Sequence, residues 1–343
     1  MNKKITRIIS ASAAALLLLS SCGNDEKLLE SSKEEKITVM TVGGFEVPME
    51  IYRYVALNYK EQYEKGQSSD IWLGESGQAL LTELNENLEK TLINMYTTQS
   101  LAVEYGIDLE SAFIKDTLKS SMDIIYESYE FDYQVYTDYL RDYNMNDSVY
   151  RFFTLNDILA DELVAMMLQN GDIPSDDAEL LEIIKGDEFI RVKQILVPSD
   201  NGFSDEENRA HAEKLLAQVE NGADFDTLAQ SSSEYGGDLY MFNNPDGYYM
   251  CRGSYHESFE DAAFALEIGE ISGIVETDAG YSIIKRYEKE DGYISKNFND
   301  LADSYVVSRY NQILEKHSET LTVSSTDKLA DYPIFNLSMT AED

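Results

Sequence analysis

The amino-acid sequence predicts an α+β protein, with a mostly helical lobe followed by a smaller domain that mixes helices and strands. The chain has 343 residues, of which 43% are hydrophobic, so it is long enough for about two domains with buried cores. Over much of residues 37–185, apolar side chains recur every three or four positions, as on one face of a helix. Over residues 186–290, short β-branched runs alternate with helical patterns and glycine breaks, which indicates an α+β unit.

Residues 1–21 have the pattern of a bacterial export signal. The segment opens with three basic residues, Lys3, Lys4 and Arg7, and continues with an uncharged apolar run over residues 8–20. This run is too short for a membrane-spanning helix, and the small residue Ser21 stands where a signal peptidase would cut. We therefore expect residues 1–21 to be removed from the exported protein.

Cys22 directly follows this segment, and the sequence Leu-Ser-Ser-Cys over residues 19–22 resembles the lipobox of bacterial lipoproteins. The resemblance implies cleavage before Cys22, lipid attachment to its sulfur and an extracytoplasmic, membrane-anchored location. A multi-acyl anchor would hold, since each buried methylene contributes about 0.8 kcal/mol. Residues 22–36, rich in Ser, Glu and Lys, then predict a flexible tether. The alternative is an ordinary signal peptide with an incidental cysteine.

The composition excludes several classes of partner and chemistry. The net charge of −37 argues against nucleic-acid binding and against adhesion to anionic lipid head groups. Cys22 and Cys251 are the only cysteines, so no intramolecular disulfide is expected once Cys22 is lipidated. No base or basic cluster neighbours Cys251 in the sequence, so we expect an unreactive loop position for it. No segment has metal-ligand spacing or a phosphate-binding glycine loop, and we expect no cofactor and no metal.

Residues 37–185 predict a helical domain that opens with a small hairpin. A β-rich run over residues 37–42 leads through two glycines into a second short run over residues 45–47. Pro48 then stands at a helix start, and helical spacing of apolar residues continues from there. The expected helices cover residues 49–65, 78–104, 109–129, 133–143, 147–169 and 175–185.

Tyrosine is abundant in this helical domain, at positions 52, 54, 59, 63, 126, 129, 133, 136, 139 and 143. One interpretation is an aromatic groove for unfolded segments, because tyrosine offers amphipathic contact at a low cost in side-chain entropy. The other, which we favour, is ordinary packing between helices.

Residues 291–343 predict one further helix and a tail. Apolar residues at helical spacing over residues 298–316 indicate the helix. The tail contains one apolar patch at residues 332–335, for which we expect either a paired strand or a loose segment.

Local signals within residues 186–290 agree with a compact α+β domain. Ser204 opens an S-x-x-E capping box before a helix, and Gly222 ends that helix. A later helix carries apolar residues on one face, and Gly269 follows it. β-branched residues over 282–286 indicate a closing strand.

The order of these blocks resembles a parvulin-type peptidyl-prolyl isomerase. The blocks are I-R-V-K-Q-I-L-V (190–197), N-G-A-D-F-D-T-L-A (221–229), G-G-D-L-Y-M-F (236–242), S-F-E-D-A-A-F-A-L-E-I-G-E-I-S (258–272) and T-D-A-G-Y-S-I-I-K-R (277–286). The layout of the helical domain is similar to that of PrsA-like and SurA-like extracytoplasmic foldases. In that family the C-terminal helix often returns to the N-terminal lobe, so the resemblance implies the same for the helix after residue 291.

The resemblance also implies a set of site residues. The proline-binding pocket corresponds to Leu239, Phe242, Tyr255 and Phe259, and the hydrogen-bonded ring beneath it to Gln194, Thr277 and Ser282. Gln194 and Ser282 stand where the family usually has histidine, and Tyr255 where it often has methionine. The acidic or cysteine position falls near Glu234. Residues 243–252 look like an insertion at the pocket rim, with Tyr248, Tyr249 and Met250 either exposed for client contact or packed on their own domain.

Two functions follow from this resemblance. The first is a lipid-anchored isomerase and folding factor that acts on X-Pro bonds of unfolded, exported polypeptides. The second is a chaperone that uses the same domain as a peptide clamp without catalysis, because both histidine positions are replaced. We expect surface roles for the three histidines, His211, His256 and His317.

Overall fold

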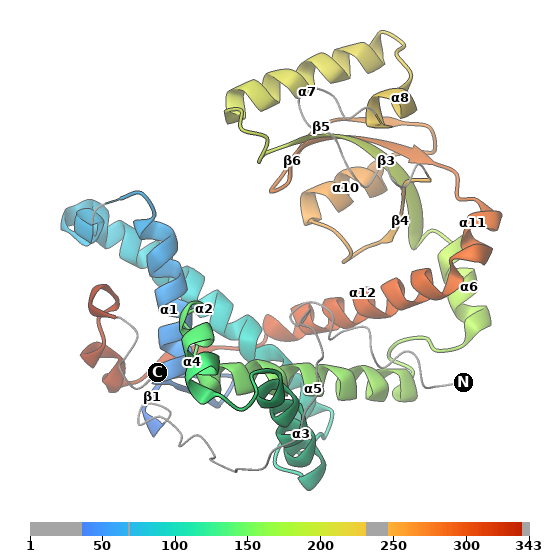
Figure 1. Ribbon diagram of the computed structural model, residues 1–343. Helices are drawn as coiled ribbons and strands as arrows, with labels where there is room; N and C mark the ends of the chain where they lie inside the picture. The colour runs from blue at the N-terminus through green and yellow to red at the C-terminus, as the bar shows by residue number, and fades with distance from the viewer. Residues whose placement is uncertain (1–35, 68, 231–245, 338–343) are drawn as a thin grey trace. The chain divides into compact units, whose positions relative to one another are not determined.

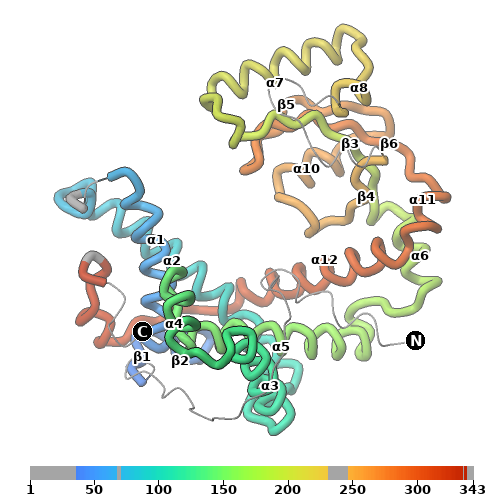
Figure 2. The backbone as a smooth tube through the Cα atoms, in the orientation of Figure 1, coloured from blue at the N-terminus to red at the C-terminus, as the bar shows by residue number. Residues whose placement is uncertain are grey.

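The computed structural model describes residues 36–67, 69–230 and 246–337, so the expected signal, the lipidation site and all but the last residue of the expected tether lie outside these ranges. The α+β class is confirmed by helices and two small antiparallel sheets. The chain divides into two compact units, one from residues 1–167 with 313–343 and one from residues 168–312. The backbone trace in Figure 2 shows that the first unit combines the described residues from 36 onward, in blue and green, with the red segment from residue 313 to 337.

The first unit contains a three-stranded antiparallel sheet with the order β2-β1-β7. The hairpin predicted around Gly43 is confirmed, and it joins β1 (Thr38–Val42) to β2 (Phe45–Pro48). The third strand, β7 (Val323–Ser325), comes from the C-terminal tail and pairs with β1. No strand was expected there, because three residues are too few for an alternating pattern to show.

The predicted helices of this region are confirmed within a few residues. They are α1 (Met49–Glu64), α2 (Gly74–Glu104), α3 (Ala112–Ser128), α4 (Tyr133–Arg141) and α5 (Asp147–Asn170). Helices α1 and α2 pack with the sheet around fully buried aliphatic side chains such as Val39, Leu84 and Leu92. The expectations for the tail were wrong. The patch forms neither a paired strand nor a loose segment. Ile334 lies in a short 3-10 helix, η6 (Ile334–Asn336), and its side chain is buried in this same core.

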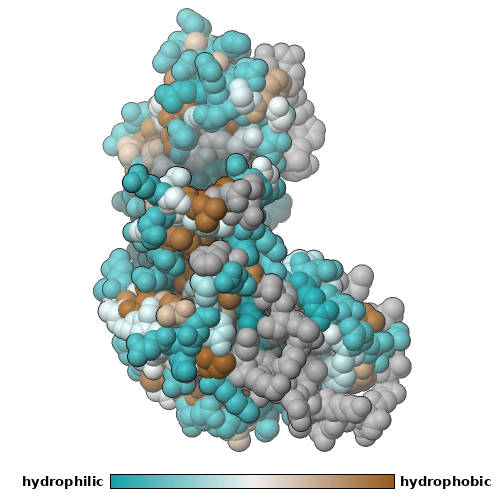
Figure 3. Space-filling view, turned by 90° about the vertical axis from the view of Figure 1, so that its left-hand side faces the viewer, coloured by the Kyte–Doolittle hydropathy of each residue, from teal (hydrophilic) through white to brown (hydrophobic). Residues whose placement is uncertain are grey.

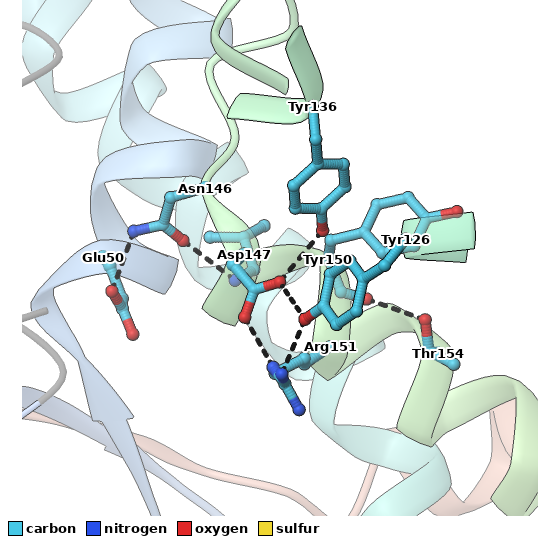
Figure 4. Close-up of polar contacts among 9 residues, drawn as sticks. Glu50, Tyr126, Tyr136, Asn146, Asp147, Tyr150, Arg151 and Thr154 are labelled. Carbon is cyan, nitrogen blue, oxygen red and sulfur yellow. Dashed lines mark hydrogen bonds and ion pairs between the residues drawn. The ribbon is translucent and has the colours of Figure 1, made fainter. Parts of the chain in front are cut away.

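A partly buried polar network joins α3, α4 and α5, as Figure 4 shows. The Asp147 carboxylate accepts hydrogen bonds from the hydroxyls of Tyr126 (2.7 Å) and Tyr136 (3.0 Å). Arg151, one turn further along α5, donates to the same carboxylate at 2.5 Å and to the Tyr126 hydroxyl at 2.6 Å. These contacts favour helix packing as the role of Tyr126 and Tyr136, while Tyr143 remains half exposed.

The second unit contains a four-stranded antiparallel sheet with the order β4-β3-β6-β5. Its strands are β3 (Phe189–Pro198), β4 (Tyr248–Cys251), β5 (Ile271–Thr277) and β6 (Gly280–Tyr287). In Figure 1, α7 (Asp205–Glu220) and α8 (Phe225–Gln230) cover one face of this sheet, and α10 (Glu257–Ala265) covers the other. The predicted capping box at Ser204 is present at the start of α7.

Three further helices complete the second unit: α6 (Asp177–Lys185), α11 (Asp291–Lys296) and the first part of α12 (Phe298–Ser318). They share a core cluster with Phe189 at the start of β3 and with Tyr249 and Cys251 of β4. Lys289 reinforces this end, because its ammonium donates hydrogen bonds to the carbonyls of Ile184, Gly186 and Phe189. The last carbonyls of α6 thus gain a cationic donor.

The surface is mainly hydrophilic on the face shown in Figure 3, where apolar side chains lie in small separate groups. Among the described residues, no helix is long and apolar enough to cross a membrane.

Candidate functional site

The candidate site lies on the face of the second sheet that α10 covers. Side chains alternate between the two faces of a strand, so Ile190, Val192 and Gln194 of β3 point to the same side. Ile190 and Val192 belong to one apolar cluster with Phe259 and Ala263 of α10. Gln194 is therefore the polar member of an otherwise apolar row.

A chain of uncharged hydrogen bonds crosses three strands at this position. The Ser282 hydroxyl of β6 donates to the Gln194 Oε1 of β3 at 2.8 Å, and the Gln194 Nε2 donates to the Tyr248 hydroxyl of β4 at 3.0 Å. Ser282 is 1% exposed and Gln194 is 9% exposed. Buried polar groups need such partners, because each one left unpaired costs about 1–3 kcal/mol.

Three aromatic rings stand next to this chain. Tyr248 contacts Tyr255 edge to face at a centroid distance of 5.5 Å, and Phe259 lies 5.7 Å from Tyr255 and 6.4 Å from Tyr248. Tyr248 and Phe259 are buried, whereas Tyr255 is 42% exposed. Tyr255 is thus the ring of this group that a bound polypeptide could reach.

The structure places the expected site residues in three situations. Gln194 and Ser282 meet directly, and Tyr255 and Phe259 lie together beside them. Thr277 is the last residue of β5, where its hydroxyl donates to the carbonyl of Gly280 at 3.1 Å across the β5–β6 turn. Four expected site residues lie outside the described part of the chain: Cys22, Glu234, Leu239 and Phe242.

Of the two alternatives for Tyr248, Tyr249 and Met250, packing on their own domain is confirmed and exposure for client contact is wrong, although the three residues form a strand and not a loop. Tyr248, Tyr249 and Met250 are buried in β4, which pairs with the first half of β3. Gly247 precedes the strand with a φ of +86°, and a Cβ there would lie 2.5 Å from the Val192 carbonyl oxygen. The strand's β-propensity and this glycine were the signals that could have identified it.

Tyr248 is consequently a site residue that sequence reasoning missed. Cys251, expected in a loop, is instead 2% exposed at the end of β4. Burial raises the pKa of the Cys251 thiol, so little of the reactive thiolate is present near neutral pH. Within the described ranges, no group of three or more His, Cys, Asp or Glu side chains is arranged to hold a metal ion.

Comparison with known proteins agrees with this geometry. Residues 179–290 match the family model of the PPIC-type PPIASE domain. The chain is 26% identical over 322 residues to the foldase protein PrsA of Caldanaerobacter subterraneus, covering 88% of this chain and 91% of that protein. It is 37% identical over 98 residues to PrsA of Geobacillus kaustophilus, covering 27% of this chain and 31% of that protein.

A solved structure of the peptidylprolyl isomerase PrsA from Bacillus anthracis aligns with 66% of this chain and 94% of its own, at 17% identity and a TM-score of 0.34. The family match and the fold define the class of the second unit: it contains a parvulin-type domain of the peptidyl-prolyl isomerases. Over most of its length the chain is similar to proteins named as PrsA foldases.

Proposed function

We propose that this protein is an extracytoplasmic folding factor that catalyses cis–trans isomerisation of X-Pro bonds in unfolded, exported polypeptides. The observation that carries the proposal is the pair of neighbouring rings Tyr255 and Phe259 beside the buried Gln194–Ser282 pair, within the segment that matches the isomerase family. Relatives named as foldases support the broader role in folding.

The reaction needs no nucleophile and no metal. Rotation about the X-Pro bond has a barrier of about 18–20 kcal/mol, because amide resonance must be broken. A pocket lowers this barrier if it binds the twisted imide more tightly than either planar form. Apolar rings such as Phe259 can hold the proline ring and exclude water, and the buried chain of hydrogen bonds can keep the strands beneath in register.

In this proposal each site residue has a separate role. Tyr255 and Phe259 contact the proline ring, and Gln194 and Ser282 fix the floor of the pocket through Tyr248. Glu234, Leu239, Phe242 and Thr277 complete the set by resemblance to the family.

A proline-limited refolding assay with the whole mature chain tests the catalytic part. We expect acceleration by the wild type and at least a tenfold loss of it in Tyr255→Ala, since about 1.4 kcal/mol of lost transition-state contact is one decade in rate. Tyr143→Ala is the matched control, because Tyr143 is also a half-exposed tyrosine but lies in the other unit. No acceleration by folded wild-type protein would remove the catalytic claim.

The second candidate function is a chaperone whose parvulin-type domain binds peptides without isomerising them. It is favoured by the Gln194–Ser282 pair itself, because neither side chain can carry a charge that would polarise the imide. Suppressed aggregation of a denatured client, together with unaccelerated refolding, would select this function.

We further propose that residues 1–21 are a signal peptide, that Cys22 carries the lipid and that residues 22–36 are the tether. We assign the rest of the chain to three parts: a chaperone-like domain over residues 37–185, the isomerase domain over 186–290 and a C-terminal segment over 291–343. Labelling of producing cells with a radioactive fatty acid should mark the wild type, and Cys22→Ala should lose the label. A protein without label, or a label that persists in the variant, rules out this anchor.

A further inference from the structure

Residues 252–255, here termed the rim loop, connect β4 to α10 and carry Tyr255, the exposed ring of the candidate site. The loop has no regular secondary structure of its own, so side chains from elsewhere must fix its position. Two groups of polar contacts do so, from opposite sides.

The first group comes from α10. The Glu260 carboxylate accepts hydrogen bonds from the backbone N–H groups of Gly253, Ser254 and Tyr255 at 2.9, 2.8 and 2.7 Å. Glu260 is 6% exposed, so these contacts lie in a desolvated environment where charge-assisted hydrogen bonds are strong. This group lies within the segment that matches the isomerase family.

The second group comes from α12, beyond the end of that segment. The Ser308 hydroxyl and the Gln312 Nε2, which lie one turn apart on α12, both donate to the carbonyl of Arg252, the latter at 2.6 Å. Ser308 is 1% exposed, and the Gln312 amide also contacts its hydroxyl at 3.3 Å. A buried hydroxyl and a partly exposed amide, both directed at a single carbonyl, make a specific anchor.

The approach of α12 to the loop is also close. Gly253 has a φ of +86°, and a Cβ at that position would lie 3.1 Å from the Ser308 Oγ and 3.3 Å from the Gln312 Nε2. The backbone of the rim loop therefore rests directly on these two side chains. Both residues belong to the same compact unit as the loop.

We propose that Ser308 and Gln312 are positioning residues of the prolyl pocket, so that α12 is part of the functional isomerase unit although it lies outside residues 179–290. They act through the Arg252 carbonyl, which sets where Tyr255 stands relative to Phe259. The role in isomerisation rests on the proposed function, whereas the anchoring of the loop does not.

The test compares the whole mature chain with its Ser308→Ala, Gln312→Ala double variant. Asn311→Ala is the matched control, because Asn311 lies on the same turn of α12 but is exposed. The first readout is hydrogen exchange of the backbone amides of Gly253, Ser254 and Tyr255. We expect exchange at least about tenfold faster in the double variant and unchanged in the control, with the amides of β3 unaffected in both.

The second readout is the steady-state kinetics of prolyl isomerisation. A displaced Tyr255 weakens binding of substrate and transition state alike, so we expect KM to rise about fivefold with kcat nearly unchanged. A general loss of folding would lower the concentration of active enzyme and hence kcat, which separates positioning from mere stability. Unaltered exchange at residues 253–255 and unaltered KM in the double variant would overturn the proposal. An inactive wild type would remove the proposed catalysis, and the exchange result would still decide whether α12 anchors the loop.

Discussion

Each of the two units of this protein contains a polar network, partly buried in the first unit and buried in the second, and the two networks differ in charge. In the first unit, Asp147 and Arg151 form an ion pair that also binds the hydroxyls of Tyr126 and Tyr136. In the second unit, the hydrogen bonds described for Ser282, Gln194 and Tyr248 join hydroxyl and amide groups, which carry no charge. Both networks join three elements, three helices in one case and three strands in the other.

The difference in charge determines how much stability each network loses when one of its side chains is removed. The Asp147 carboxylate is a hub, because three side chains depend on its two oxygens. Its removal leaves two hydroxyls and a guanidinium without their acceptor, and unpaired buried charges are costly. Each of the two hydrogen bonds described for the Ser282–Gln194–Tyr248 chain joins uncharged groups, so the loss of one of them costs less than the loss of a shared carboxylate. The charged network thus has a structural role in helix packing. The uncharged groups of the second network can be buried without a counter-ion, as a site that excludes water requires.

The largest expected effect is on the hub. Asp147→Ala should lower the free energy of unfolding of the first unit by about 3 kcal/mol, since the partly buried Arg151 loses its counter-ion. Urea unfolding followed by tryptophan fluorescence measures this, because the single tryptophan, Trp72, is buried in that unit.

Asp138→Ala is the matched control for this prediction. Asp138 also pairs with an arginine on its own helix, Arg141 at 2.8 Å, but both side chains are exposed. Exposed pairs contribute little, so a loss below about 0.5 kcal/mol is expected. Equal effects of the two variants would show that the buried network is no more important than a surface ion pair.

A second, smaller effect should appear at alkaline pH. Burial, followed by the charge of Asp147, raises the pKa of Tyr136 above its ordinary value of 10.0. A group whose pKa is higher in the folded state contributes stability that is complete below pH 10 and is lost as pH rises further. The loss is at most about 1.4 kcal/mol per pH unit for this tyrosine.

Tyr136→Phe should therefore unfold less steeply between pH 10 and 12 than the wild type, after a cost of about 1 kcal/mol at neutral pH for the lost hydrogen bond. Tyr143→Phe, at a half-exposed position, serves as the control. Parallel pH profiles for Tyr136→Phe and the wild type would contradict the assignment of alkaline lability to this network.

The sequence predicted the helices well because their signals are local. Apolar spacing and Gly106, which has a φ of +81° after α2, define elements without reference to distant partners. Strand β7 could not be predicted, since its three residues become a strand only by pairing with β1. The hydrogen bonds to Asp147 could not be predicted either. Arg151 lies four residues from Asp147, but Tyr126 and Tyr136 lie 21 and 11 residues away, on other helices.

The candidate site was accessible from sequence only through family resemblance. Nothing in the local pattern shows that Gln194 and Ser282 meet, since they lie 88 residues apart and are joined by strand pairing. Tyr248 was missed because β4 was mistaken for a loop, although its pairing with β3 brings it to Gln194. The anchors of the rim loop on α12 lie outside the family segment and could be found only in the structure.

The smallest expected effect concerns the neutral network, for which the wild type should show almost no response to pH. Neither Gln194 nor Ser282 titrates, so the isomerisation rate should vary less than about twofold between pH 5.5 and 8. A Gln194→His, Ser282→His double variant should instead acquire a transition below pH 6.5, since burial at these two positions lowers the pKa of an imidazole from its free value. His256 lies at the N-terminus of α10, so the wild-type profile is also measured in a His256→Gln background. A transition near pH 6.5 that persists in that background would mean that a charged group outside the Gln194–Ser282 pair governs the pocket, and the contrast between the two networks would then fail.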